Sequence, residues 1–331
     1  MSTITPIPLS TLKNYVATAF PSSDPNSIKL TRQPSIEGDD HMIFFIDREP
    51  HYLLRITKTR EDRPVNMKEM HAQDIAIREY VRSAYRSRGL DGDVIPRCIG
   101  SWRVGEGDEE CVVSLEERIR GVGLDRGTGS EATRDGLVKL LCILKSIDVD
   151  ELEKELDIGL LRIPARDLMK LYESAEEAWK RLFERGQLFP LGLPISDKSL
   201  VEDLFEKKVT RLFAEIQKLS PHHIPSLIHN DLKGEHILID ESTGQITGIL
   251  DWADAGIGDA AVDIAGLVIT VGKDVAVGIA RDVAYEEGKI AEGVVIARCE
   301  CVLRLDCRLN GVDDSSPVSL LRDQLGLALR D

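Results

Sequence analysis

The chain has 331 residues, of which 42% are hydrophobic and 30% charged, and its formal net charge at pH 7 is −15. The length is enough for two lobes or two domains, and the composition is that of a soluble globular protein. The negative charge argues against nucleic acid or an anionic membrane as a partner, and no apolar run is long enough to cross a bilayer.

The first part of the chain is predicted to form strands around one helix. Two apolar strands, 43–46 and 52–56, are joined by a polar turn, and a further strand is expected at 111–115. A helix is expected from Met67 to Tyr85, and Gly105–Glu110 is typical of a hairpin turn.

The middle and the end of the chain are predicted to be helical. Leucines and isoleucines between 137 and 147 recur at helical spacing, and helices are also expected at 165–185 and 199–219. Two more are expected at 275–288 and 291–309. We interpret their apolar stripes as packing surfaces rather than as parts of a cofactor site.

Two segments of the second half indicate the chemistry. The first, 227–240, contains the His-x-Asp motif of His229 and Asp231, followed five residues later by His236. The second ends an expected strand, 245–250, with Asp251. A kinase catalytic loop has this layout, because one carboxylate receives a hydroxyl proton and others hold Mg²⁺ on the nucleotide phosphates. A lone His-x-Asp is also typical of a simple turn, so the prediction depends on both segments together.

These segments resemble the aminoglycoside phosphotransferase family, a branch of the protein-kinase-like fold. The matching positions are His229, Asp231, Asp251-Trp252, Gly258-Asp259 and Asp263. The resemblance implies that Asp231 is the catalytic base and Asp251 the main Mg²⁺ ligand, with His229 and Asp263 as structural support. It also implies an α+β, bilobal fold with a small β-rich N-lobe and a larger, mainly helical C-lobe.

His236 departs from the family pattern, because most members carry Asn at this position. Mg²⁺ prefers oxygen ligands to imidazole, so the second metal position is in doubt. A His here is similar to the 2″-aminoglycoside and macrolide phosphotransferase branches. We therefore interpret His236 as the mark of a subgroup and keep it as a candidate metal ligand.

The resemblance also assigns residues to the nucleotide. Arg55, at the end of the second strand, is expected to contact the phosphates, with Lys58 as the alternative. Glu79 resembles the acidic residue that pairs with this cation, although a solvated helix face explains it equally well. The segment 116–121 resembles the family's linker between lobes, in which the backbone from Glu117 to Ile119 would bind the purine.

Several residues beside the two motifs are candidates for the acceptor site. Lys233 can stabilise the transferred phosphoryl group or can be a plain surface lysine. Glu235 and Asp254 are candidates to receive substrate amines, whereas Asp259 can instead cap the following turn. The acidic segment 35–41 is the nearest candidate for a phosphate-covering turn, and no Walker-type Gly-Lys-Ser/Thr loop occurs.

The sequence thus predicts a nucleotide-binding lobe at 1–115, a linker at 116–121 and a catalytic and acceptor-binding lobe at 122–331. The expected reaction moves the γ-phosphate of ATP or GTP, with Mg²⁺, to a hydroxyl of a small, cationic acceptor. Two alternatives stay open: a kinase of a cellular metabolite, and a catalytically weak pseudokinase that serves as an interaction module. We expect a cytoplasmic protein, because its start lacks the features of a signal peptide and its six cysteines include no Cys-x-x-Cys pair.

Overall fold

The structure is a computed structural model. It describes residues 7–21, 24–34, 37, 41–47, 49–58, 67–105, 111–125, 129–189, 203–219, 224–311 and 316–330. The chain forms two compact units, one made of residues 1–121 and 247–253 and the other of residues 122–246 and 254–331. Most of the candidate phosphate turn at 35–41, and of the hairpin turn at 105–110, lies outside the described residues.

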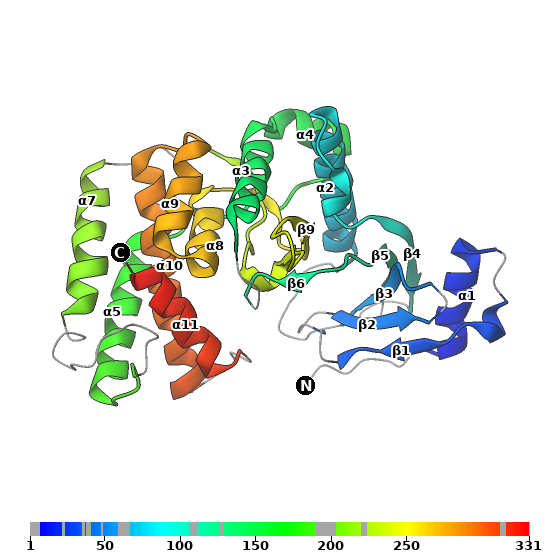
Figure 1. The fold of residues 1–331 in the computed structure, drawn as a ribbon, viewed down its shortest axis with the longest axis horizontal. Coiled ribbons are helices and arrows are strands. Elements are labelled where there is room, and N and C mark those ends of the chain that lie inside the picture. The colour runs from blue at the N-terminus through cyan, green and yellow to red at the C-terminus, as the bar shows by residue number, and fades with distance from the viewer. Residues whose placement is uncertain are drawn as a thin grey trace. The chain divides into compact units, whose positions relative to one another are not determined.

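The first unit is built on a five-stranded antiparallel sheet in the order β1-β2-β3-β5-β4 (Figure 1). Its strands are β1 (Leu30–Arg32), β2 (His41–Ile46), β3 (Tyr52–Thr57), β4 (Cys98–Val104) and β5 (Cys111–Glu117). Its two long helices are α1 (Leu9–Ala19) and α2 (Met67–Ser87), and a short strand, β9 (Ile246–Ile249), leads to Asp251. The three strands and the helix predicted from the sequence are present, whereas α1 and β1 were not predicted.

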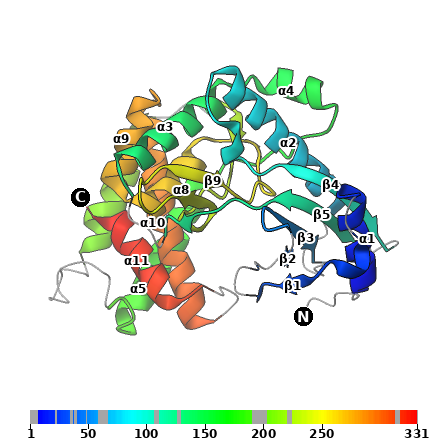
Figure 2. The same ribbon diagram turned by 45° about the vertical axis from the view of Figure 1, so that its right-hand side comes forward.

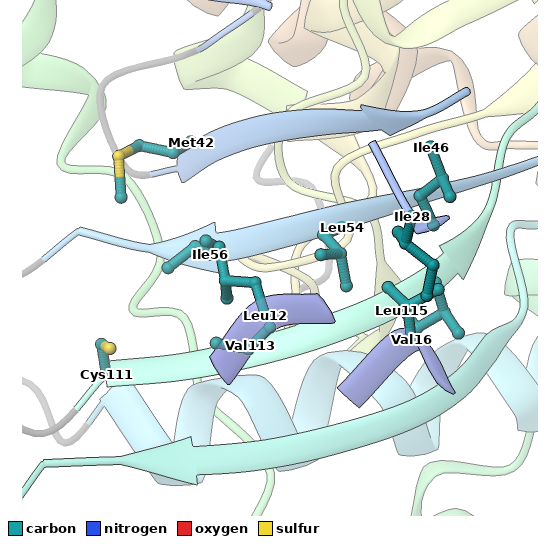
Figure 3. Packing of buried hydrophobic residues seen from close by; sticks show 10 residues of the cluster. All are labelled: Leu12, Val16, Ile28, Met42, Ile46, Leu54, Ile56, Cys111, Val113 and Leu115. Atoms are coloured by element: carbon teal, nitrogen blue, oxygen red, sulfur yellow. The ribbon is translucent and has the colours of Figure 1, made fainter. Parts of the chain in front are cut away.

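The two faces of this sheet differ in chemistry because side chains alternate along each strand. Leu54 on β3 and Val113 on β5 point to one face, where they form an apolar core with Leu12 and Val16 of α1 (Figure 3). The intervening residue Arg55 contacts α2 on the other face. The sheet therefore separates an apolar layer under α1 from an ionic layer under α2.

The second unit is mainly helical. Its helices are α3 (Glu131–Ser146), α4 (Val149–Leu156), α5 (Leu168–Glu184), α7 (Arg211–Leu219), α8 (Ala261–Val271), α9 (Lys273–Asp282), α10 (Glu287–Asn310) and α11 (Val318–Leu329). Helix α10 packs against α5, α8 and α11, and Figure 2 shows these helices gathered around it. Eight consecutive residues of α10, 292–299, are buried, so this helix is the centre of the unit.

Two helices of this unit differ from the sequence expectation. The helix predicted at 199–219 contains a π-helical turn, Glu206–Thr210, before α7, and residues 199–202 lie outside the described part. The helix predicted at 275–288 ends at Asp282, because Ala284 adopts a left-handed backbone with φ 58° before α10 begins.

Short strands frame the loop that carries the His-x-Asp motif. Strand β7 (Ser226–Ile228) precedes the loop and pairs antiparallel with β10 (Gly256–Gly258). A 3₁₀ turn, Gly234–His236, and β8 (Ile237–Ile239) follow it, and β8 pairs with β6 (Val122–Gly123). Both ends of the loop are thus fixed by strand pairing. Among the described residues, no helix is long and apolar enough to span a membrane.

Candidate active site

The loop from His229 to Asp231 is anchored by one buried carboxylate. Asp263, in the first turn of α8, accepts the backbone N–H of His229 at 2.9 Å on one oxygen and that of Asn230 at 2.8 Å on the other. Burial raises the pKa of Asp263 to about 6, against the lowering effect of these two hydrogen bonds. Asp263 thus joins α8 to the loop, and its supporting role in the reaction stays a prediction.

The same loop turns sharply at Asn230. Its φ of 65° lies in the left-handed region, which Asn tolerates better than most residues. Its side-chain amide donates to the carbonyl of Asp254 at 3.2 Å. The ring of His229 is fully buried, and its Nδ1 accepts the N–H of Asp231 at 3.3 Å. The side chain of Asp231 is 22% exposed.

Two cationic or polar side chains contact Asp231. The Lys233 ammonium lies 2.5 Å from Oδ1 of Asp231, and Nδ1 of His236 lies 2.8 Å from its backbone oxygen. His236 Nδ1 is also 3.4 Å from Oδ2 of the same carboxylate. The structure therefore brings Asp231, Lys233 and His236 together, as a proton acceptor beside a positive charge.

Glu235 and Asp254, the candidates for substrate amines, occupy different surroundings. Glu235 is half-buried in the 3₁₀ turn, and within the described part of the chain its Oε2 has no hydrogen-bond partner. Asp254 supports the loop through its backbone carbonyl. Their role in acceptor binding stays a prediction.

Asp259 acts as a structural residue. Its Oδ1 accepts the N–H of Ala261 at 2.9 Å, which caps the start of α8. Its Oδ2 lies 2.5 Å from the ammonium of Lys289, which is buried and also contacts Glu292 at 2.7 Å. The structure thus agrees with the alternative in which Asp259 caps the following turn.

In the first unit, Arg55 stands at the centre of a buried ionic network. Its guanidinium donates to Asp74 of α2 at 3.2 Å and to Asp251 at 2.9 Å, and lies 4.0 Å from Glu116 of β5. Arg78 of α2 pairs with Asp74 at 3.0 Å and Glu116 at 3.1 Å. Two arginines and two buried carboxylates therefore lie between α2 and the sheet.

The network fixes the charge of its members. Burial alone would lower the pKa of Arg55, but the carboxylates of Asp74, Glu116 and Asp251 outweigh it and raise the pKa. Burial alone would raise the pKa of Glu116, but Arg78 and Arg55 lower it to about 2. Both groups therefore stay charged at neutral pH.

A histidine completes the surroundings of Arg55. His41 of β2 faces the guanidinium, with 3.2 Å between its Nδ1 and Nη2 of Arg55. Burial, and then the charge of Arg55, lower the pKa of His41 to about 3. His41 is therefore neutral, and its Nδ1 accepts the hydrogen bond.

The acidic partner of the strand cation is Asp74, and the structure does not bring Glu79 to Arg55. Glu79 lies five residues further along α2, its side chain is 47% exposed, and it pairs with Arg82 at 3.9 Å. Lys58, the alternative cation, lies 3.8 Å from Glu37. Glu79 therefore lies on a solvated face of α2, which is the alternative considered for it.

The carboxylate of Asp251 meets the requirements of a Mg²⁺ ligand better than the ring of His236 does. Asp251 is 42% exposed, has a positive φ of 59° and presents an oxygen donor beside Arg55. Mg²⁺ usually takes one or two protein carboxylates and completes its shell with water and substrate phosphates. His236 offers only nitrogen, and its Nδ1 already faces the oxygens of Asp231. Among the described residues, no three His, Cys, Asp or Glu side chains are grouped to hold a metal.

The linker after β5 already uses part of its backbone. The N–H of Glu117 donates to the carbonyl of Arg97 at 2.9 Å, and that of Arg118 donates to His51 at 2.7 Å. The Glu117 side chain lies 3.5 Å from Arg82. These two amides are therefore engaged within the sheet, and the purine contact stays a prediction for the rest of the segment, notably Ile119.

Comparison with known proteins decides the family. The model of the phosphotransferase enzyme family, APH, matches residues 33–292, which is more than half of the chain. The chain belongs to this family. The resemblance inferred from the motifs is therefore confirmed.

An individual relative of this chain is matched over a short segment only. A viomycin phosphotransferase of Streptomyces vinaceus is 32% identical over 92 residues, which are 27% of this chain and 29% of that protein. The match thus spans less than a third of that relative's length.

Solved structures agree over the whole fold. The GDP complex of an aminoglycoside 2′-phosphotransferase-IIIa has a TM-score of 0.54 at 18% identity, covering 96% of this chain and 97% of that one. The streptomycin–ATP complex of APH(2″)-IIa has a TM-score of 0.51 at 15% identity, with 95% of each chain covered. The predicted kinase-like fold, a β-rich N-terminal part and a mainly helical C-terminal part, is confirmed.

Sequence reasoning missed three members of the ionic network around Arg55: Asp74, Arg78 and Glu116. Two signals could have found them. Glu116 and Ser114 are polar residues two apart in strand β5, which places both on one face of the sheet. Asp74 and Arg78 are four apart on α2, where side chains pair along a helix.

Proposed function

We propose that this protein transfers the γ-phosphate of a nucleoside triphosphate, ATP or GTP, to a hydroxyl of a small acceptor that carries amino groups. Aminoglycoside-like compounds and other amino-bearing metabolites form this class. The observation that carries the proposal is Asp231 at the tip of an anchored loop, with Lys233 at 2.5 Å. Support comes from the family and from neighbours solved with GDP, and with ATP and streptomycin.

In this mechanism Asp231 accepts or orients the proton of the acceptor hydroxyl. Phosphoryl transfer needs little covalent help, so positioning and charge neutralisation supply most of the acceleration. The two backbone hydrogen bonds to Asp263 hold the loop that carries Asp231. Lys233 places a positive charge beside the carboxylate, where it can neutralise the transferred phosphoryl group.

On the nucleotide side, Arg55 binds the phosphates, and Asp74 and Glu116 hold its guanidinium in one orientation. Asp251, with His236 as the weaker candidate, would hold Mg²⁺, which supplies charge neutralisation on the phosphates when bound. The backbone near Ile119 would bind the purine. A nucleoside triphosphate as donor fits the expected cytoplasmic location.

The first test is turnover of ATP and GTP with Mg²⁺ over a panel of aminoglycosides, viomycin-like peptides, macrolides, amino alcohols and sugars. The expected result is a mass gain of one phosphate on an amino-bearing acceptor. Transfer only to a neutral sugar would contradict the acceptor class and keep the reaction. Tight nucleotide binding without any transfer would favour the pseudokinase alternative.

The base is tested by Asp231→Asn, with Glu241→Gln as the matched control. Both changes remove one carboxylate charge, but Glu241 is an exposed turn residue ten positions later. We expect Asp231→Asn to lower kcat by at least about 10²-fold with nucleotide affinity kept, and Glu241→Gln to behave as the wild type. A kcat of Asp231→Asn within threefold of the wild type would remove Asp231 from the role of base.

A further inference from the structure

The junction between β10 and α8 supports the loop that carries Asp231 through two sets of contacts. Strand β10 pairs with β7, which ends at Ile228, the residue before His229. Helix α8 carries Asp263, which accepts the backbone N–H groups of His229 and Asn230 at 2.9 and 2.8 Å. The position of this junction therefore determines where the loop lies.

Asp259 forms the junction and holds the first turn of α8. It follows β10 directly, its carboxylate accepts the N–H of Ala261 at 2.9 Å, and its carbonyl accepts that of Val262 at 3.0 Å. Asp263 lies four residues further along the chain, which is about one helical turn. Because this hydrogen-bonded turn joins the two aspartates, a displacement of Asp259 also displaces Asp263.

Lys289 of α10 holds Asp259 from the neighbouring helix. Its ammonium lies 2.5 Å from Oδ2 of Asp259 and 2.7 Å from Oε2 of Glu292. All three side chains belong to buried residues, and buried charges are tolerated when they are paired and hydrogen-bonded. Burial alone would lower the pKa of Lys289, but its hydrogen bonds to the two carboxylates outweigh it and raise the pKa, so the ammonium stays charged.

Helix α10 presents this ammonium from a closely packed position. Helices α8 and α10 lie against one another (Figure 2), and Ile290, next to Lys289, belongs to an apolar cluster with Ile264 of α8. A Cβ at Gly293 would lie 2.6 Å from Ile264 and 2.9 Å from the carbonyl oxygen of Ala261, so glycine is needed for this approach. The helix that carries Lys289 is therefore seated on the first turn of α8 itself.

We propose that Lys289 is a positioning residue for the phosphoryl transfer. Through Asp259 it fixes the first turn of α8, and with it the two hydrogen bonds that the loop donates to Asp263. Without the ammonium, the carboxylates of Asp259 and Glu292 would face each other in a buried site, and their repulsion would displace Asp259. Hydrogen bonds weaken as their geometry departs from the ideal, so Asp263 would hold the loop less firmly.

The expected consequence is a lower kcat with substrate binding retained. The inference rests on the proposed function, in which Asp231 receives the proton of the acceptor hydroxyl. A displacement of about 1 Å in a reacting group can lower the rate about 10²-fold, so a small shift of the loop is enough. Lys289 acts on the protein's own carboxylates from a buried position, and the affinities for nucleotide and acceptor should therefore change little.

The first measurement is hydrogen exchange of the full chain, read by mass spectrometry on peptides covering residues 226–233. Peptides of α3, in the same unit, serve as the internal reference. Lys289→Met removes the ammonium and keeps an unbranched side chain. We expect the amides of His229 and Asn230 to exchange at least about tenfold faster in this variant, with the α3 reference unchanged, because the loop opens locally.

The matched control is Asp306→Asn on the same helix. Asp306 is also buried, and it pairs with Arg181 of α5 at 2.5 Å. The substitution therefore removes a buried charge of α10 at a contact with α5 instead of α8. We expect the loop amides of this control to exchange at the wild-type rate.

The second measurement determines kcat and KM for the acceptor that the turnover panel identifies. We expect kcat of Lys289→Met to fall at least about tenfold, with KM for nucleotide and acceptor within about twofold of the wild type. An unfolded fraction would also lower kcat, and the α3 reference peptides detect it. Asp306→Asn should keep the wild-type kcat.

A second variant keeps the test decisive if Lys289→Met does not fold, as judged by circular dichroism. Lys289→Met/Glu292→Gln removes the ammonium together with one carboxylate, which relieves the repulsion while Asp259 still loses its contact with Lys289. The loop amides should again exchange faster than in the wild type. Wild-type exchange in a folded Lys289 variant, equal acceleration in Asp306→Asn, or faster exchange with unchanged kcat would overturn the inference. Faster exchange in a protein whose wild type transfers no phosphate would instead refute the proposed function and keep the support of the loop by Lys289.

Discussion

Replacing Asp74 by Asn should damage nucleotide binding, whereas replacing Glu79 by Gln on the same helix should not. Asp74 is 2% exposed and pairs with both Arg55 and Arg78. Glu79 is 47% exposed and contacts Arg82 at 3.9 Å. Both substitutions remove one negative charge from α2 and keep the side-chain shape, so they differ in location rather than in chemistry.

The magnitude follows from what remains after each change. Loss of one partner from a buried ion pair costs about 3–5 kcal/mol. Here Glu116 still faces both arginines, and the Asn keeps one oxygen acceptor, so we expect about 2–3 kcal/mol of unfolding free energy. For Glu79→Gln we expect less than about 0.5 kcal/mol, as for an exposed pair. Arg55 would also lose its fixed orientation, which should weaken nucleotide binding by about tenfold.

Two measurements check this: urea unfolding of both variants, and titration with a fluorescent nucleotide analogue in the presence of Mg²⁺. The contrast between the two variants is the decisive quantity. If Glu79→Gln weakens nucleotide binding as much as Asp74→Asn, then Asp74 is not the partner that orients Arg55. A stable Asp74→Asn protein with wild-type affinity would also contradict the network as described.

Two further predictions concern the anchoring of the catalytic loop. Gly266→Ala should lower turnover at least tenfold, because the new methyl group would push the loop at Leu232. The control is Gly278→Ala in α9, where the atom nearest to the new Cβ is 3.7 Å away. It should leave turnover unchanged and stabilise the fold by up to about 1 kcal/mol. Equal turnover in the two variants would contradict the close approach of Gly266 to Leu232. Asp263→Asn should remove a pH dependence of the unfolding free energy. Because the pKa of Asp263 is raised to about 6 in the folded chain, its protonated form stabilises the fold fully below about pH 4. About 3 kcal/mol of this stability is lost as the pH rises through about 6. Unfolding at pH 4 and 7 measures this, and an equal change in wild type and variant would refute it.

The residues of the predicted catalytic loop could be grouped from the sequence because their contacts are local. His229, Asp231 and His236 lie within eight residues, and Asp263 follows on the helix that the motif itself begins. Spacing along strands and turns therefore determined which of these side chains meet. The structure adds Asn230 to these residues. Its left-handed backbone and its contact with Asp254 do not follow from any spacing rule.

The ionic network of the first unit was harder to predict because its members are far apart in the chain. Arg55 meets residues 19 and 196 positions away. Helix α2 carries three acidic residues, Glu69, Asp74 and Glu79, and which of them meets Arg55 depends on which side of the helix faces the sheet. That side is set by the packing of Ile77 and Val81, both fully buried, and by the burial of Arg78 and Arg82. The polarity of the two arginines would instead predict that they face solvent.

The roles of the charged residues of α10 could not be predicted from periodicity for a different reason. An amphipathic helix reveals its inner face by its apolar stripe, but α10 is buried on nearly all sides and includes buried Lys289, Glu292 and Arg298. In the sequence, a charged residue of α10 that binds a neighbouring side chain therefore cannot be distinguished from one that binds a ligand. The folded chain resolves this for two of them: Lys289 contacts Asp259 at 2.5 Å and Glu292 at 2.7 Å, and Arg298 donates to the backbone carbonyl of Ala328 at 2.8 Å. The charged residues of α10 that the pattern leaves ambiguous therefore hold the helices of this unit together, and this role is visible only in the folded chain.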